Sequence, residues 1–165
     1  MGHRANFVII ENGRATAYRD RWAALGCTFT LMDGPGEARS AARSSEPTTE
    51  LMDWAFAEAG YLLDFDENRA IAFGHPDLPL DDDFLEADTA AAMNAAMDAL
   101  NQGPAEFFKH VAAKWRGWTL VWDDRGVDAF AEHLARRSIT VIQTQPASHP
   151  AKTADPVEFT VPAGR

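Results

Sequence analysis

The first residues of the chain have a pattern of apolar and turn-forming residues that is typical of a β-hairpin. Two largely apolar runs, Phe7–Ile10 and Ala15–Tyr18, flank the dipeptide Asn12-Gly13. This dipeptide most readily adopts the positive φ angles of a type I′ turn. A two-residue turn fixes the pairing of the strands residue by residue, and alternate residues then point to opposite faces of the hairpin. The pattern therefore predicts which side chains meet at the open end.

Three arginines are predicted to gather there. The residues expected on one face are Arg4, Asn6, Arg19 and Arg21. His3 and Trp22 are expected on the other face. Like charges at this spacing repel each other unless a carboxylate or a bound anion lies between them. One hypothesis is that carboxylates of the same chain neutralise the arginines. The other is a phosphate or carboxylate site, with Trp22 stacked on a planar ligand and His3 as the candidate acid or base.

Two helices are predicted between residues 33 and 60. The first has Asp33 as its cap and Pro35 in its first turn, and it extends to Arg43. The second is indicated by apolar residues at helical spacing, and Gly60 ends it. The residues of that stripe are Leu51, Trp54, Ala55 and Ala59.

The remaining pattern indicates a second hairpin, three more helices and a tryptophan-rich strand. The hairpin joins Tyr61–Asp66 to Arg69–Phe73 around Glu67-Asn68, with Asp66 opposite Arg69. The further segments are helices over 84–100, 104–115 and 127–136, a strand over 117–122, and two short strands over 139–142 and 157–161. We therefore expect an α+β fold, in which four to five helices pack on a mainly antiparallel sheet built from the two hairpins and the tryptophan-rich strand. Residues 1–137 are predicted to form one domain, and residues 138–165 an extension that supplies edge strands or a loose tail.

Composition agrees with a single domain. The chain has 165 residues, of which 46% are hydrophobic, and this suits one sizeable core. Its single cysteine, Cys27, excludes an intrachain disulfide framework. Neither a leader pattern nor a long apolar run is present, so we expect a cytoplasmic protein without membrane association.

The charge is strongly negative and uneven. A formal net charge of −10 disfavours nucleic-acid binding, which needs lysine and arginine to neutralise phosphates, and it permits a basic protein partner. Between Asp64 and Asp88 there are nine acidic residues and one arginine. Such a segment can steer a cationic partner or simply serve as a solvated surface. The residues expected to contact a partner are Asp77, Asp81, Asp82, Asp83 and Glu86.

Familiar catalytic and metal-binding motifs are incomplete. The run Asp64-x-Asp66-x-Asn68 matches the start of a calcium loop, but Arg69 occupies the position of the essential glycine and His75 that of the bidentate glutamate. The histidines lack zinc-motif spacing, and no phosphate-binding glycine loop is present. We therefore predict no metal site and no cofactor.

Three segments carry a resemblance to other proteins. They are Met1-Gly-His-Arg-Ala-Asn with the Glu-Asn-Gly turn, Leu62-Leu-Asp-Phe-Asp66, and Trp115-Arg-Gly-Trp-Thr-Leu-Val-Trp122. In these segments the chain resembles a group of uncharacterised bacterial proteins, over roughly residues 1–135. The second strand of that group typically ends in a Tyr-Tyr-Ser-His-Trp-like run, so Arg21 replaces the group's histidine here. The resemblance implies no established activity.

Two functions of different class follow from the sequence. The first is an acidic interaction module, for instance an immunity or inhibitor protein that binds a basic bacterial partner. The alternative is a small ligand-binding domain or enzyme that uses the arginine, histidine and tryptophan side chains at the mouth of the first hairpin. We favour the interaction module because most enzymes of this size show some recognisable catalytic constellation, whereas binding proteins often do not.

Overall fold

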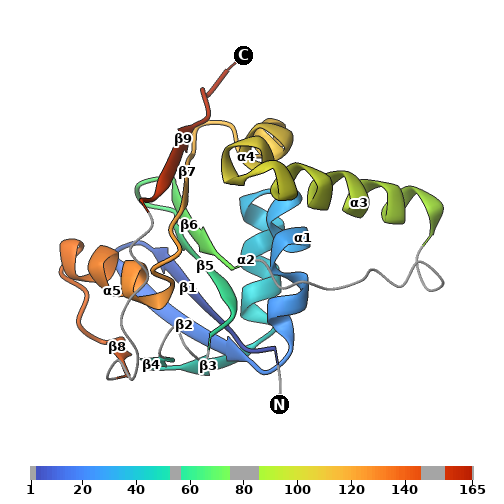
Figure 1. Ribbon diagram of the computed structural model, residues 1–165. Coiled ribbons are helices and arrows are strands. Elements are labelled where there is room, and N and C mark those ends of the chain that lie inside the picture. Colours follow the sequence, from blue (N-terminus) through green and yellow to red (C-terminus); the bar gives the residue numbers. More distant parts are fainter. Residues whose placement is uncertain (1–2, 53–56, 75–85, 146–154, 165) are drawn as a thin grey trace.

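A seven-stranded mixed sheet forms the centre of the computed structural model, which describes residues 3–52, 57–74, 86–145 and 155–164 (Figure 1). The strands follow the order β3-β2-β1-β5-β6-β7-β9, and β4 and β8 form a separate two-stranded sheet. The strands are β1 (Ala5–Glu11), β2 (Arg14–Asp20), β3 (Glu46–Thr48), β4 (Glu50–Leu51), β5 (Ala59–Asp64), β6 (Arg69–Phe73), β7 (Thr119–Trp122), β8 (Gln143–Thr144) and β9 (Val157–Thr160). The helices are the 3₁₀ turn η1 (Ala23–Gly26), α1 (Cys27–Met32), α2 (Pro35–Arg43), α3 (Ala87–Gln102), α4 (Pro104–Val111), the 3₁₀ turn η3 (Ala112–Lys114) and α5 (Val127–Arg136).

Helices cover both faces of the sheet. The helices α1 to α4 lie on one face, and α5 lies on the other (Figure 1). Each face has its own apolar cluster, one with Phe7 and Trp122 against α1 to α4 and one with Val8 and Ile71 against α5. The central strands β1 and β5 are consequently buried on both faces, as strands of a covered sheet must be.

The first hairpin has the predicted turn and register. Asn12 and Gly13 both have positive φ, 53° and 73°, and the pairing extends from Ala5 with Asp20 to Glu11 with Arg14. The strand expected over 117–122 begins at Thr119 as β7, and the side chains of Trp118, Leu120 and Trp122 lie in one buried cluster as expected. The α+β class is confirmed.

The sheet is mixed, so the expectation of a mainly antiparallel sheet is partly wrong. Pairs within a hairpin are antiparallel, but β1 pairs with β5 in parallel, and so does β6 with β7. The physical reason is the connection: helices cross over between these strands, and a crossover brings the chain back in the same direction.

Two local predictions fail between residues 48 and 73. No helix begins near Leu51, because Leu51 ends strand β4, and Ala59 begins β5; residues 53–56, including Trp54, lie outside the described part of the chain. In the second hairpin Asp64, not Asp66, lies opposite Arg69. The Asp64 carboxylate accepts hydrogen bonds from the Asp66 and Glu67 amides, 3.0 and 3.1 Å, and thereby builds a longer turn.

Residues near the end of the described chain, Val157–Thr160, join the large sheet. Strand β9 pairs antiparallel with β7 at the edge of the large sheet. The other expected strand is displaced: residues 139–142 are irregular, and Gln143–Thr144 pair with β4 instead. Among the described helices, even the 16-residue α3 lacks the length and apolarity that a bilayer-spanning helix requires.

Candidate functional site

A hollow of about 250 Å³ lies at the open end of the first hairpin, where the sequence places the arginine cluster. The described residues that line it are Arg4, Arg19, Asp20, Arg21, Glu46 and Met52. Three of the predicted anion-binding residues are therefore brought together around one cavity. They come from both strands of the hairpin, while Glu46 comes from the neighbouring strand β3, opposite Arg19.

The fourth predicted residue on this face, Asn6, is not among the described residues that line the hollow, but it bonds to the backbone of one of them, Met52. The Asn6 side chain is fully buried, and its amide group both donates and accepts a hydrogen bond. The Asn6 Nδ2 atom donates to the Tyr18 carbonyl at 3.1 Å, and the Met52 backbone N–H donates to Asn6 Oδ1 at 2.8 Å. Asn6 thus holds Met52 against the hairpin, and we assign it a positioning role.

The arginines differ in their partners. Arg19 Nη2 lies 3.4 Å from Glu46 Oε1, and both side chains are more than half exposed, so this pair is weak. Arg4 and Arg21 have no ion pair within the described part of the chain. The Asp20 carboxylate is occupied otherwise, since its Oδ1 accepts from the backbone N–H groups of Trp22 and Ala23 at 2.7 and 2.9 Å. The neutralisation of the arginines by carboxylates is therefore incomplete among the residues described.

His3 and Trp22 are not among the described residues that line the hollow. His3 Nδ1 lies 2.8 Å from Glu58 Oε2, and the His3 and Trp22 rings are 6.1 Å apart and tilted by 52°. Trp22 is 55% exposed. These two rings form a separate aromatic pair beside the hairpin mouth.

Most of the expected acidic partner surface, Asp77 and Asp81 to Asp83, lies outside the described residues. Glu86 is exposed directly before α3. Part of the acid-rich segment is neutralised internally, because the carboxylates of Asp64, Asp66 and Glu67 all pair with arginines at the end of α5.

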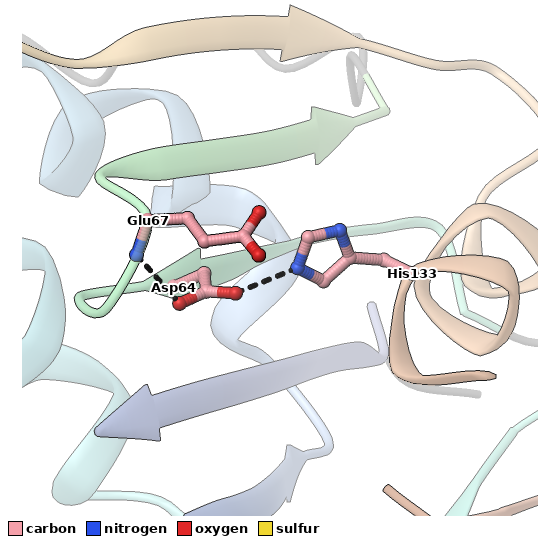
Figure 2. Close-up of side chains that lie close together, drawn as sticks. All are labelled: Asp64, Glu67 and His133. Atoms are coloured by element: carbon pink, nitrogen blue, oxygen red, sulfur yellow. Dashed lines mark hydrogen bonds and ion pairs between the residues drawn. The ribbon is translucent and has the colours of Figure 1, made fainter. Parts of the chain in front are cut away.

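A second polar cluster, which the sequence did not predict, joins α5 to the second hairpin (Figure 2). We call it the clasp; its members are Asp64, Asp66, Glu67, His133, Arg136 and Arg137. Asp64 is completely buried, and its Oδ2 atom lies 2.8 Å from His133 Nε2 and 2.5 Å from Arg137 Nη1. Arg136 pairs with Glu67 at 2.7 Å.

The hydrogen bonds of the clasp identify the protonation state of His133. Arg136 Nη2 lies 3.1 Å from His133 Nδ1, and a guanidinium can only donate, so Nδ1 is the acceptor. The single ring proton is then on Nε2 and is donated to Asp64. Burial lowers the pKa of His133, opposed by the hydrogen bond with Asp64, and this agrees with a neutral ring. For Asp64, burial opposes ionisation, but the hydrogen bonds from His133 and Arg137 outweigh it and lower the pKa.

The clasp contains a possible ligand set for a metal ion but is occupied by arginines. One ligand atom from each of Asp64, Glu67 and His133 lies within 4.8 Å of the others. A metal would need the lone pair of His133 Nε2, which carries the proton, and both carboxylates already accept guanidinium hydrogen bonds. The donor set therefore fits an ion-pair network.

The sequence contained only a weak sign of the clasp. His133, Arg136 and Arg137 lie on one helix face because they are three or four residues apart. Their partners, however, are about seventy positions earlier in the chain, with 69 between Asp64 and His133.

Comparison of the chain with protein families, curated proteins and solved structures finds no match. The resemblance to a bacterial group accordingly stays a prediction, and the function must be argued from the site itself.

Proposed function

We propose that this chain is a small binding protein that holds an anionic ligand at the open end of its first hairpin. The observation that carries the proposal is the presence of two arginines, Arg4 and Arg21, without a described carboxylate partner in one hollow of an acidic molecule. The chain has 25 acidic and 15 basic residues, so two arginines that share one hollow without a described carboxylate partner are candidates to hold an external anion.

Guanidinium chemistry supports this interpretation. Arginine offers a planar fork of N–H donors that matches a carboxylate, sulfate or phosphate group. Two like charges that line the same hollow raise each other's electrostatic energy, and an anion between them removes that cost. The groups are also well placed, because β2 is held between β1 and β3, and Asn6 ties Met52 to the same hairpin.

The proposal assigns binding and not catalysis. His3, the candidate acid or base, is paired with Glu58 and is not among the described residues that line the hollow. An acidic interaction module is the second candidate function, supported by the net charge of −10 and by the exposed Glu86. The surface proposed for a partner consists of Asp77, Asp81 to Asp83 and Glu86, and it excludes the three acids of the same segment that the clasp neutralises.

Binding of butyl sulfate, measured by isothermal titration calorimetry, tests the proposed anion site. We expect the Arg4→Gln and Arg21→Gln variants each to weaken binding about tenfold or more, because a charge-assisted hydrogen bond contributes about 1.5–3 kcal/mol. The matched control is Arg14→Gln, which removes an exposed arginine at the other end of the same hairpin. Unchanged affinity in both site variants, or an equal loss in the control, would contradict the proposal.

A further inference from the structure

We infer that Asn12 is a site of spontaneous deamidation and that the Asp66 carboxylate of the clasp protects it in the folded chain. Asn12-Gly13 is the sole Asn-Gly pair of the sequence. It forms the turn of the first hairpin, at the end opposite to the arginine hollow, so the inference does not depend on the proposed anion site. It concerns the covalent stability of the turn that sets the register of the hairpin.

Deamidation of an asparagine begins with the backbone nitrogen of the next residue. Here the nitrogen of Gly13 loses its proton and bonds to Cγ of Asn12, the side-chain nitrogen leaves as ammonia, and a five-membered succinimide ring results. Water then opens the ring at either of its two carbonyl carbons, which gives aspartate or isoaspartate at position 12. Glycine favours the first step, because it has no side chain to obstruct the ring and its backbone is the least restricted.

Asn12 has the exposure that the reaction requires. Asn12 and Gly13 are both exposed, so water reaches the side-chain amide. Within the described part of the chain, no hydrogen bond holds the Asn12 side chain. Asn68 has the same φ of 53° and is also exposed, but Arg69 follows it, and a side chain at the next residue obstructs ring closure. Asn68 is therefore an internal comparison.

The Gly13 nitrogen is held by Asp66. The Gly13 N–H donates to Asp66 Oδ2 and the Asn12 N–H donates to Asp66 Oδ1, both at 2.8 Å. An anionic acceptor stabilises the N–H group in its protonated form, whereas ring closure requires that the proton leave. The Gly13 nitrogen must also release Asp66 before it can bond to Cγ of Asn12. This contact therefore opposes the first step of the reaction.

The carboxylate of Asp66 is itself fixed and ionised. Arg137 Nη2 lies 3.1 Å from Asp66 Oδ2 and ties this carboxylate to the end of α5. The hydrogen bonds from Gly13 and Asn12 lower the pKa of Asp66, so the carboxylate is ionised at neutral and alkaline pH, where loss of a backbone proton is favoured. The clasp thus protects the turn as well as joining it to α5.

Peptide mapping by mass spectrometry measures the reaction, since replacement of the side-chain NH₂ by OH changes the mass of the fragment that contains Asn12. The unmodified chain, the same chain unfolded in guanidinium chloride, and two variants are incubated at pH 8 and 37 °C. Asp66→Ala removes the acceptor of both turn amides. Glu67→Ala is the matched control, because it removes another carboxylate of the clasp, which accepts from Arg136.

We expect Asn12 to deamidate at least tenfold faster in the unfolded chain than in the folded chain, because loss of a hydrogen bond to a charged group shifts an equilibrium by about tenfold or more. In the folded chain, Asp66→Ala is expected to raise the rate at least threefold, and Glu67→Ala to leave it unchanged. Asn68 is expected to stay unmodified in the folded samples. Circular dichroism checks the fold of both variants, and Asp66→Asn, which retains one acceptor oxygen, replaces Asp66→Ala if the latter does not fold.

Three results would overturn the inference. Absence of deamidation at Asn12 in the unfolded chain excludes the site. A rate in D66A equal to that of the unmodified folded chain excludes Asp66 as the protecting group. An equal rise in E67A attributes the effect to general loosening of the clasp. Each of these results leaves the anion site standing, because butyl sulfate tests that site at the other end of the hairpin.

Discussion

At the scale of single residues, Gly60 shows how tightly the two hairpins are joined. It lies on β5 directly opposite Asn6 of β1, and both residues are buried. A Cβ atom at position 60 would lie 2.1 Å from the Asn6 carbonyl oxygen, far inside van der Waals contact. The backbone of β1 would have to move, and with it the Asn6 side chain that holds Met52.

We therefore expect Gly60→Ala to lower the free energy of unfolding by about 3 kcal/mol, as overpacking of a close-packed interior does. Urea denaturation followed by circular dichroism measures the change. Gly36→Ala is the matched control: that glycine is exposed on α2, a Cβ there meets nothing within 4 Å, and alanine favours the helix by about 1 kcal/mol. Similar stability of the two variants would show that the join between β1 and β5 is more pliable than the structure indicates.

At the scale of elements, the clasp fastens the last turn of α5 to the turns of both hairpins. Arg137 reaches Asp64 and Asp66 of the second hairpin, and the Asp66 carboxylate accepts from the amides of Asn12 and Gly13 at 2.8 Å each. One arginine and one aspartate thus connect three segments that are distant in the sequence.

The clasp predicts how stability depends on pH. Folding lowers the pKa of His133, because burial disfavours the charged ring and Arg136 faces Nδ1. As the pH falls, His133 therefore binds a proton in the unfolded chain before it does so in the folded chain. The stability that is present above the ordinary pKa of 6.5 is lost as the pH falls below this value. Asp64 acts in the same direction at lower pH, below its ordinary pKa of 3.8, because its pKa is also lowered in the folded state.

His133→Gln separates the two contributions. A glutamine amide can still donate to Asp64 and accept from Arg136, but it does not titrate. We expect the free energy of unfolding of this variant to stay level from pH 7 to pH 5, where that of the unmodified chain falls. Urea denaturation across this range makes the comparison.

Phe130→Leu, a core change on the same helix, provides a destabilised control that retains the slope with pH. If the free energy of unfolding of H133Q falls with pH as steeply as that of the unmodified chain, His133 is excluded as the source of this pH dependence.

Local elements were predictable where local chemistry determines them. The first hairpin follows from Asn12-Gly13, and α5 occupies the residues expected of it. The pattern failed near Leu51 because β4 and β8 are two-residue strands, too short to show any alternation. The parallel pairs were missed because the strands that they join belong to separate parts of the sequence. Which strands become neighbours, and in which direction they run, depends on the path of the helices that connect them.

The candidate site also has a part that the sequence could predict and a part that it could not. The hollow could be located from the register of one hairpin, which places Arg4, Arg19 and Arg21 on a shared face. Glu46 and Met52 could not be predicted as part of the hollow. Glu46 is brought there by the pairing of β3 with β2, and Met52 by a long-range hydrogen bond to Asn6. The clasp has its two halves in separate parts of the chain, so no local pattern contains it.

At the scale of the whole molecule, the net charge of −10 is the property most relevant to a protein partner. For the second candidate function, we expect a basic partner to associate about tenfold more slowly with the D81N/D82N/D83N variant, because long-range attraction raises association rates. Surface plasmon resonance at low and physiological salt measures this rate.

The variant D88N/D98N provides the comparison, since both of its sites are exposed on α3. A rate and salt dependence unchanged in the triple variant would exclude those three aspartates as the docking surface.

The parallel joins in the sheet also determine how the molecule can fold. Each hairpin is local, and we expect it to form within about 1–10 μs, whereas the pairing of β1 with β5 joins residues as far apart as Ala5 and Ala59 and is expected to form more slowly. The arginine hollow takes one wall from β3, which pairs with β2, and its methionine follows β4, so it also requires contacts beyond the first hairpin. The part of the hollow that the first hairpin supplies can therefore form early, and the complete hollow is present only in the finished sheet.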